Sequence, residues 1–238
     1  MPHVDALSPS HAEARHELYR PIHKALRAFM SDTLAVVGRM DTNDEHDVAA
    51  ALEQTRSLVA VLTIHLQDEN RFVHAAMEAR RPGSAAHTAR DHVEHECALA
   101  ELKSMIDAVE STGGAERAKL AFSLYARLAL LVAENLVHMH VEERENMAVL
   151  WAEYSDEELG AIERQIVASV PPAMMATAAR WFVAGLNHAE RVGWFQGMRR
   201  GAPPAVFEGM LAIARGNLSA RDWTKLASAL SLPAARAA

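Results

Sequence analysis

The sequence predicts an all-α protein, an up-down-up-down four-helix bundle followed by a C-terminal helical extension. Three observations predict it. Gly and Pro are sparse, 11 and 9 in 238 residues, and Ala, Leu, Glu and Arg fill the intervals between them, which favours helix. Four long intervals are joined by short turn-like segments, and short connections make consecutive helices antiparallel neighbours. Within each interval apolar residues recur at the 3.6-residue period of an amphipathic helix.

The four bundle helices are predicted, in chain order, at about residues 10–39, 45–78, 86–110 and 116–153. Their connections contain residues that break helices: the polar run 41–44, Pro82-Gly83 and Gly113-Gly114. After the fourth helix, Ser155 and Glu158 form a capping-box pattern, in which a Ser side chain and a Glu three residues later satisfy free backbone N–H groups. A new helix is therefore predicted to begin there.

The chain is predicted to divide into a bundle over residues 1–155 and an extension over residues 156–238. Beyond residue 170 the histidines nearly stop, Pro171-Pro172 interrupts the chain, and aromatic residues become frequent. Helices are predicted at about 173–200, 203–215 and 220–230, the last capped by Ser219. We expect the aromatic side chains to pack the extension on the bundle or on a second subunit, so a homodimer through the extension is one outcome that they allow.

The composition excludes several classes of protein. Lys+Arg 24 against Asp+Glu 31 gives a net charge of −7 without a dense basic cluster, so we expect no nucleic-acid partner. The single cysteine, Cys97, excludes a disulfide framework and favours a reducing compartment. No secretion signal is visible, and no uncharged apolar stretch approaches the roughly 18 residues of a membrane span. We therefore expect a cytoplasmic protein without a membrane partner.

The 13 histidines, most of them before residue 145, suggest a metal site. Each predicted bundle helix has a histidine on the apolar face that should point into the bundle. Two of these helices also have a glutamate four residues after the histidine, in His65-x-x-x-Glu69 and His138-x-x-x-Glu142. Residues four apart lie one turn apart on the same helix face, so both side chains of a pair can bind one metal site. A cation would also compensate the cost of burying the glutamates.

The pattern occurs twice. His23 precedes the first His-x-x-x-Glu motif by almost the same distance as His95 precedes the second. The bundle therefore consists of two helical hairpins, each of which supplies a His and then a His-x-x-x-Glu. Bundle proteins build di-metal sites from inward-facing ligands in this way. The predicted ligands are His23, His65, Glu69, His95, His138 and Glu142.

This ordered set resembles the hemerythrin-like family, the HHE cation-binding domain, over roughly residues 10–155. The resemblance implies two non-haem iron ions bridged as Fe–O–Fe or Fe–OH–Fe. It also implies that Glu69 and Glu142 are bridging carboxylates and that the four histidines are terminal ligands. An open position would accept dioxygen or a related small molecule.

The sequence departs from the oxygen-carrying hemerythrins at two points. Those proteins have a fifth histidine one turn along the third helix, where this chain has Leu99, and an Asp five residues after the fourth-helix histidine, where this chain has Glu142 at four. His92, one turn before His95, is an alternative source of the extra ligand. A second register, which pairs His140 with Glu145, is disfavoured because Arg144 shares that face. His74 is expected at the surface.

The first functional reading is a non-haem di-iron protein that binds or senses dioxygen, iron or a reactive small molecule. A second reading is a di-iron redox enzyme that acts on peroxide or nitric oxide. A third is a helical bundle that holds another divalent metal and has an interaction role.

Overall fold

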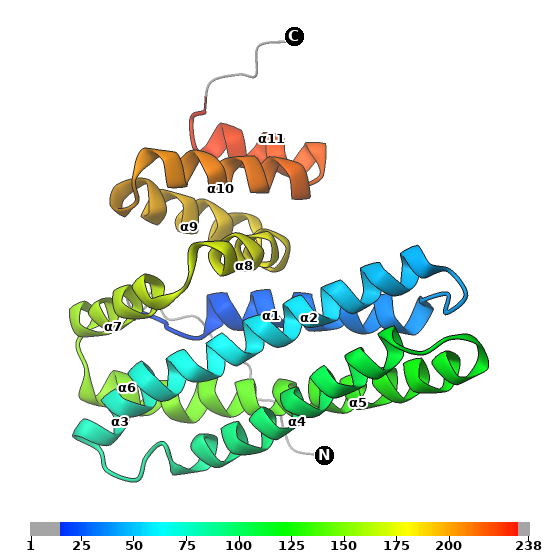
Figure 1. Ribbon diagram of the computed structural model, residues 1–238. Coiled ribbons are helices and arrows are strands. Elements are labelled where there is room, and N and C mark those ends of the chain that lie inside the picture. Colours follow the sequence, from blue (N-terminus) through cyan, green and yellow to red (C-terminus); the bar gives the residue numbers. More distant parts are fainter. Residues whose placement is uncertain (1–14, 233–238) are drawn as a thin grey trace, which may run out of the picture.

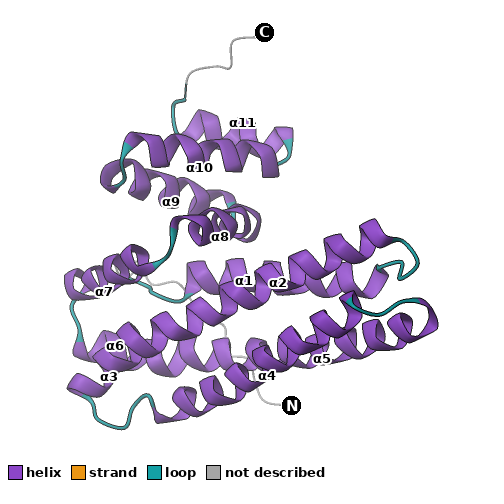
Figure 2. Cartoon of the chain, in the orientation of Figure 1, coloured by secondary structure: helices purple, strands orange, loops and turns teal. Residues whose placement is uncertain are grey.

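The computed structural model describes residues 15–232, and within that range it contains helices and loops but no strand (Figure 2). The first part of the chain forms, in order, α1 (Arg20–Arg39), α2 (Glu45–Asp68), η1 (Glu69–His74), α3 (Ala75–Arg80), α4 (Ala86–Glu110), α5 (Gly114–Val141), η2 (Glu142–Asn146) and α6 (Met147–Glu153). The all-α class predicted from the sequence is confirmed.

The long helices pack around one apolar core. α1 contacts α2, α2 contacts α4, α4 contacts α5, and α5 returns to α1, which closes a ring (Figure 1). Leu58, Leu102, Ile106, Leu124 and Leu128 fill the centre of the ring and are fully buried. These residues belong to the stripes that the apolar periodicity predicted, so the helices face inward as expected.

The first helix begins later than predicted. The sequence suggested a start near residue 10, but α1 begins at Arg20 and Pro21 lies in its first turn. A proline has no N–H and its ring clashes with the carbonyl four residues before it, so it is tolerated in the first turn and not in the interior. Residues 15–19 are accordingly not helical, and residues 10–14 of the predicted helix lie outside the described residues.

Two predicted helices also contain a wider turn. The predicted second helix consists of α2, the π-helical segment η1 and α3 in succession. The predicted fourth helix consists of α5, the π-helical segment η2 and α6. Each π-helical segment starts at the glutamate of a His-x-x-x-Glu motif: η1 at Glu69 and η2 at Glu142. π segments occur frequently at functional sites because they re-aim the side chains that follow.

The extension consists of α7 (Asp156–Ser169), α8 (Pro172–Gly185), α9 (His188–Gly201), α10 (Pro204–Asn217) and α11 (Ala220–Ala229). The predicted capping box at Ser155 and the cap at Ser219 are confirmed. The single helix predicted at 173–200 is wrong, because Asn187 and Glu190 form a second capping box that starts α9. A capping box fixes a helix start, so the chain breaks between α8 and α9.

The extension has its own small core and docks on the bundle through α8, which packs mainly on α1. Trp181 of α8 stacks on Phe29 of α1, with ring centroids 4.2 Å apart and planes 12° apart. Lys24 of α1 forms an ion pair with Glu190 of α9. At Gly185 the two backbones approach so closely that an added Cβ would lie 2.5 Å from the Lys24 carbonyl oxygen.

Among the described residues, one helix, Gly114–Glu153, is long and apolar enough to cross a membrane by length and composition alone; a bent pair, α7 with α8, would count as a second. Only 33% of the most apolar window of Gly114–Glu153 is buried. The sequence predicts no span, because charged residues interrupt its apolar stretches. A bundle core helix passes the same criterion, and its inward face carries His138 and Glu142.

Gly185→Ala should destabilise the protein by about 1–3 kcal/mol, because the methyl group has no space against the α1 backbone. Thermal unfolding followed by circular dichroism measures the change. Gly193→Ala is the matched control, since no described atom lies within 4 Å of its added Cβ and Ala is favoured over Gly in a helix by about 1 kcal/mol. Equal melting temperatures for the two variants would contradict the close contact.

Candidate metal centre

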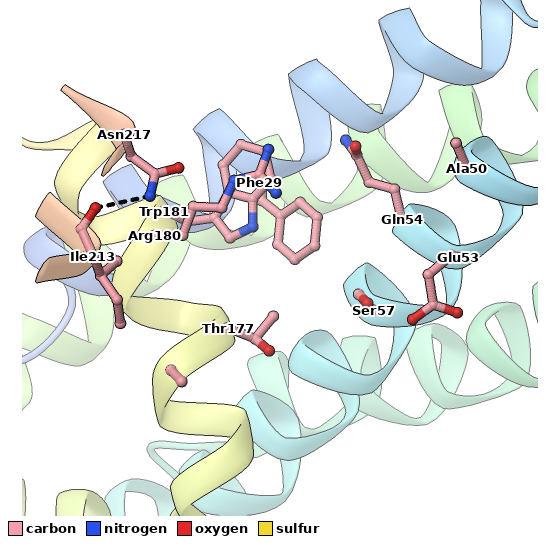
Figure 3. Close-up of a pocket in the computed structure, with 11 residues that line it drawn as sticks. Phe29, Ala50, Glu53, Gln54, Ser57, Thr177, Arg180, Trp181, Ile213 and Asn217 are labelled. Atoms are coloured by element: carbon pink, nitrogen blue, oxygen red, sulfur yellow. Dashed lines mark hydrogen bonds between the residues drawn. The ribbon is translucent and has the colours of Figure 1, made fainter. Parts of the chain in front are cut away.

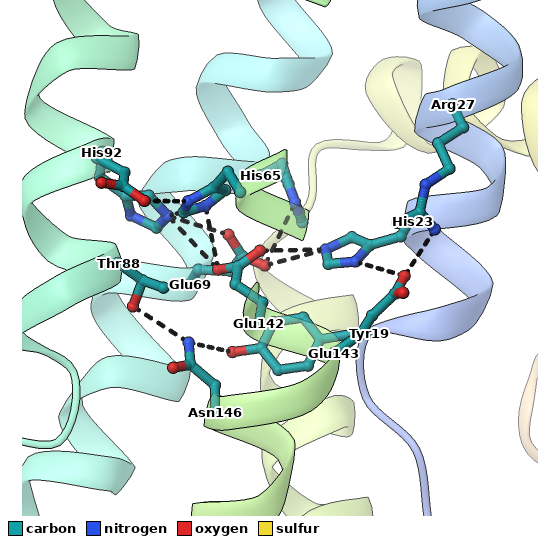
Figure 4. A network of polar contacts seen from close by, with 12 residues as sticks. Tyr19, His23, Arg27, His65, Glu69, Thr88, His92, Glu142, Glu143 and Asn146 are labelled. Carbon is teal, nitrogen blue, oxygen red and sulfur yellow. Dashed lines mark hydrogen bonds and ion pairs between the residues drawn. The ribbon is translucent and has the colours of Figure 1, made fainter. Parts of the chain in front are cut away.

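The six predicted ligands come from four stretches of helix, and five of them, all but His95, meet in the interior of the ring; Figure 4 labels His23, His65, Glu69 and Glu142 among them. Every one is buried except His65, whose side chain is 11% exposed. The elements that supply them are α1 for His23, α2 and η1 for His65 and Glu69, α4 for His95, and α5 and η2 for His138 and Glu142.

The side chains form two groups that share both glutamates. The first group is His23, His65, Glu69 and Glu142, and the second is Glu69, His92, His138 and Glu142. Within each group one ligand atom per residue lies within 4.8 Å of all the others. The two groups have both carboxylates in common, so each carboxylate could offer one oxygen to each group.

The separations suit ions bound between the side chains. Within the two His-x-x-x-Glu pairs, His65 Nε2 lies 3.3 Å from Glu69 Oε1, and His138 Nε2 lies 3.3 Å from Glu142 Oε1. Across the ring, His23 Nε2 lies 3.4 Å from Glu142 Oε2. Ligand atoms bound about 2.0–2.2 Å from one ion, at angles between 90° and 109°, are about 3.0–3.5 Å apart.

Unsatisfied polar atoms test whether a cation fits this place. Both oxygens of Glu69, both oxygens of Glu142 and His23 Nε2 are buried without a hydrogen-bond partner among the described residues. Nearly all buried polar atoms in proteins have a partner, and buried carboxylates are expensive without one. The unsatisfied atoms belong to the two groups, so the residues fit a bound metal.

The structure places His92 in the second group, and His95 lies beside it. His92 Nε2 is 3.5 Å from Glu69 Oε2 and 3.6 Å from Glu142 Oε1. The His95 ring stands edge-on to His138, with centroids 4.9 Å apart, and its buried Nδ1 has no partner in the described part of the chain. The assignment of His95 as a ligand stays a prediction, and His92, weighed as an extra ligand, has the geometry of a ligand.

Carboxylates outside the groups orient two of the imidazoles. His23 Nδ1 lies 3.1 Å from Glu143, which also accepts from Arg27 at 2.6 Å. His138 Nδ1 lies 3.1 Å from Asp91 Oδ2. Since a carboxylate only accepts, each Nδ1 carries a hydrogen, and Nε2 is the ring nitrogen that can bind a metal once it has no proton. Such outer contacts fix the tautomer and raise the basicity of the ligand.

A side-chain amide orients a third imidazole, that of His92. Asn70 Oδ1 lies 2.8 Å from His92 Nδ1 and 3.1 Å from His74 Nδ1. The neighbouring contacts continue from His74 Nε2 to Thr88 and from Thr88 to the amide of Asn146. This belt of hydrogen bonds fixes the position of the His92 ring.

The belt ends at Tyr19, whose hydroxyl oxygen accepts from Asn146 at 3.2 Å. Tyr19 is buried, and its ring centroid lies 5.1 Å from that of His23. The expectation that His74 lies at the surface is wrong, because it is buried and its ring stacks on His92. His74 follows Glu69 through the wider turn of η1, whereas a continuous α-helix would aim it elsewhere.

The electrostatics divide the histidines into two kinds. Burial acts to lower the pKa of His23 and of His138, but the carboxylates around them, chiefly Glu142, outweigh burial and raise those pKa values to about 10 and about 9. Burial and the neighbouring His138 lower the pKa of His95 to about 4. Burial also lowers the pKa of His65. Without a metal, the carboxylates therefore hold protons on His23 and His138.

Clefts on the described surface lie away from these ligands. One, of about 560 Å³, opens between α1, α2, α8 and α10, and its lining includes Phe29, Arg180 and Trp181 but none of the metal-ligand residues (Figure 3). The ligand groups themselves are enclosed.

Comparison with protein families identifies the class. Residues 15–150 match the Hemerythrin HHE cation binding domain. This match covers more than half of the chain, so the chain belongs to that family, and the resemblance drawn from the histidine and glutamate pattern is confirmed. No curated protein and no solved structure matched the chain.

Metal uptake should release about two protons per chain at about pH 8, because the metal-binding nitrogens of His23 and His138 must lose theirs. The raised pKa values stabilise the metal-free fold below the unfolded value of 6.5, and that stabilisation is lost as pH rises through about 9 and about 10. Anaerobic calorimetric titration with Fe²⁺ in two buffers of different ionisation enthalpy measures the release. A heat that does not depend on the buffer would contradict the protonated state.

Proposed function

We propose that this hemerythrin-family chain holds two non-haem iron ions and uses them to bind or sense dioxygen or another small reactive molecule. Glu69 and Glu142 would bridge the ions. His23 and His65 would complete the first site, and His92 and His138 the second. The observation that carries the proposal is the pair of ligand groups with two shared carboxylates.

The donor set supports iron and a small ligand. Imidazole and carboxylate together suit iron, whereas a soft-metal site would need thiolates. Two divalent ions bring four positive charges, and the two bridging carboxylates offset two of them. Asp91 and Glu143, in contact with the ligand histidines, offset part of the remainder from outside. The residual positive charge favours a small electron-rich ligand.

Burial restricts what that ligand can be. His23 and Glu142 have no exposed surface, and Glu69 and His138 are each 4% exposed. Dioxygen, nitric oxide and peroxide are small enough, and a bulky organic substrate is not. The ring of four long helices supports the up-down-up-down bundle that such a site requires. When bound, the ions would supply electrons and an open coordination position, while the chain supplies orientation and excludes water.

Glu69→Ala and His138→Ala should each reduce bound iron from about two ions per chain to less than one, because Glu69 belongs to both sites and His138 to the second. Metal analysis together with near-ultraviolet absorption of protein from iron-supplemented cells measures the loss. His140→Ala is the control, since His140 is exposed on the same helix. Full retention of both ions in Glu69→Ala would contradict the bridging assignment.

The same preparations distinguish the alternative functions. Zinc in the wild-type protein would favour a non-redox metal site. Rapid turnover of peroxide would favour a redox enzyme.

The same metal analysis separates His92 from His95. His92→Ala should lose iron from the second site and leave the first partly occupied. His95→Ala should keep iron close to the wild-type content, because the structure does not bring His95 into either ligand group. Loss of iron in His95→Ala and retention of iron in His92→Ala would instead identify His95 as the ligand from the third bundle helix.

A further inference from the structure

The outward face of α5 carries a line of apolar side chains that nothing in the described chain covers. Phe122 is 70% exposed, Leu130 53% and Val137 67%. The exposed residues Ala126 and Ala133 lie between them on the same face, because steps of three and four residues return to one side of a helix. We call these five residues the α5 stripe.

The apolar surface is concentrated on this layer of the molecule. Of the seven exposed large apolar residues in the described chain, five lie on α4 or α5: Val93, Phe122, Leu130, Leu136 and Val137. The opposite layer is different, since α8 of the extension packs on α1 and also contacts α2 (Figure 1). The extension thus covers one layer and leaves α4 and α5 open.

The aromatic side chains of the extension are already used within the chain. Trp181 stacks on Phe29 of the bundle, and Phe182 stacks on Trp194 with centroids 5.2 Å apart. A contiguous exposed apolar patch marks an interaction site in a soluble protein. The strongest unoccupied patch is therefore on α5 and not on the extension.

We propose that the α5 stripe is the interface of a two-fold homodimer in which α5 packs antiparallel against α5 of a second copy. A two-fold contact uses the same patch on both copies, so the patch must complement itself. The α5 stripe does so about an axis near Leu130. Antiparallel pairing about that axis sets Phe122 opposite the partner's Val137, and Ala126 opposite the partner's Ala133, where small side chains let the helices approach closely.

Charge supports the same pairing. Arg127 and Glu134 flank the α5 stripe on the side toward α4, and Arg127 already lies 3.7 Å from Glu134 and 2.6 Å from Glu101 of its own chain. With Phe122 set opposite the partner's Val137, Arg127 and the partner's Glu134 lie on the same side of the α5 stripe and only about 3 Å apart along the helices, so antiparallel pairing brings them within reach of each other.

The polar surroundings favour a protein partner over a lipid surface. Glu101 of α4, which pairs with Arg127 beside the α5 stripe, is exposed, and the chain has a net charge of −7. An anionic membrane would repel this rim. Lys119 and His140, both exposed, end the α5 stripe at its two extremities, as polar residues do at the rim of an interface.

Sedimentation velocity on the full-length protein tests the proposal. The wild-type protein should be a dimer and Leu130→Glu a monomer, because the substitution brings two carboxylates together at the axis. Val167→Glu should remain a dimer; Val167 lies on α7 and is 54% exposed, which matches the 53% of Leu130. Circular dichroism and metal content check that each variant is folded. The proposal would be overturned if the wild-type protein were a monomer, whether or not that monomer floats with phosphatidylcholine vesicles. It would also be overturned if Leu130→Glu were a dimer.

Cysteine cross-linking tests the register. In a Cys97→Ser background, the double variant Ala126→Cys/Ala133→Cys should oxidise to a disulfide-linked dimer, because each new thiol faces the other one on the partner. Each single variant should not, since identical residues would then lie about 10 Å apart along the helices and a disulfide needs Cα atoms within about 7 Å. Cross-linking of a single variant as fast as the double, or none in the double, would overturn the antiparallel register.

Discussion

Two carboxylates buried without hydrogen-bond donors impose the constraint on which the rest of this structure depends. Glu69 and Glu142 lie in the core, and their four oxygens have no partner in the described chain. Desolvation of each anion costs several kcal/mol, roughly, unless opposite charge compensates it. Four imidazoles surround the carboxylates. In the metal-free state, protons on His23 and His138 can supply part of the compensation, and two divalent ions can supply all of it.

The helices hold this arrangement in place with a second layer of contacts. Glu143 and Asp91 orient two imidazoles from outside, and Asn70 orients His92. Each of these contacts leaves Nε2 directed at the carboxylates, so the site is organised before a metal arrives. The extension stiffens one layer of the bundle by docking α8 on α1. The proposed dimer would cover the other layer, next to the helix that carries His138.

Much of the site could be predicted from the sequence, because its key spacing is local. A histidine and a glutamate four residues apart share a helix face whatever the tertiary structure, so His65 with Glu69 and His138 with Glu142 were predictable. The π turns were not, since no residue pattern in these segments marks them. The choice between His92 and His95 could not be predicted either. The two lie about 60° apart around the helix, and only the rotation of α4 in the bundle decides which of them reaches the carboxylates.

The central claim is that two ions lie between Glu69 and Glu142. X-ray diffraction at the iron absorption edge, on crystals of the iron-loaded protein, tests it most directly through the anomalous difference map. Two peaks are expected, one between the two glutamates and His23 with His65, the other between the glutamates and His92 with His138. A single peak, or iron bound elsewhere in the chain, would contradict it.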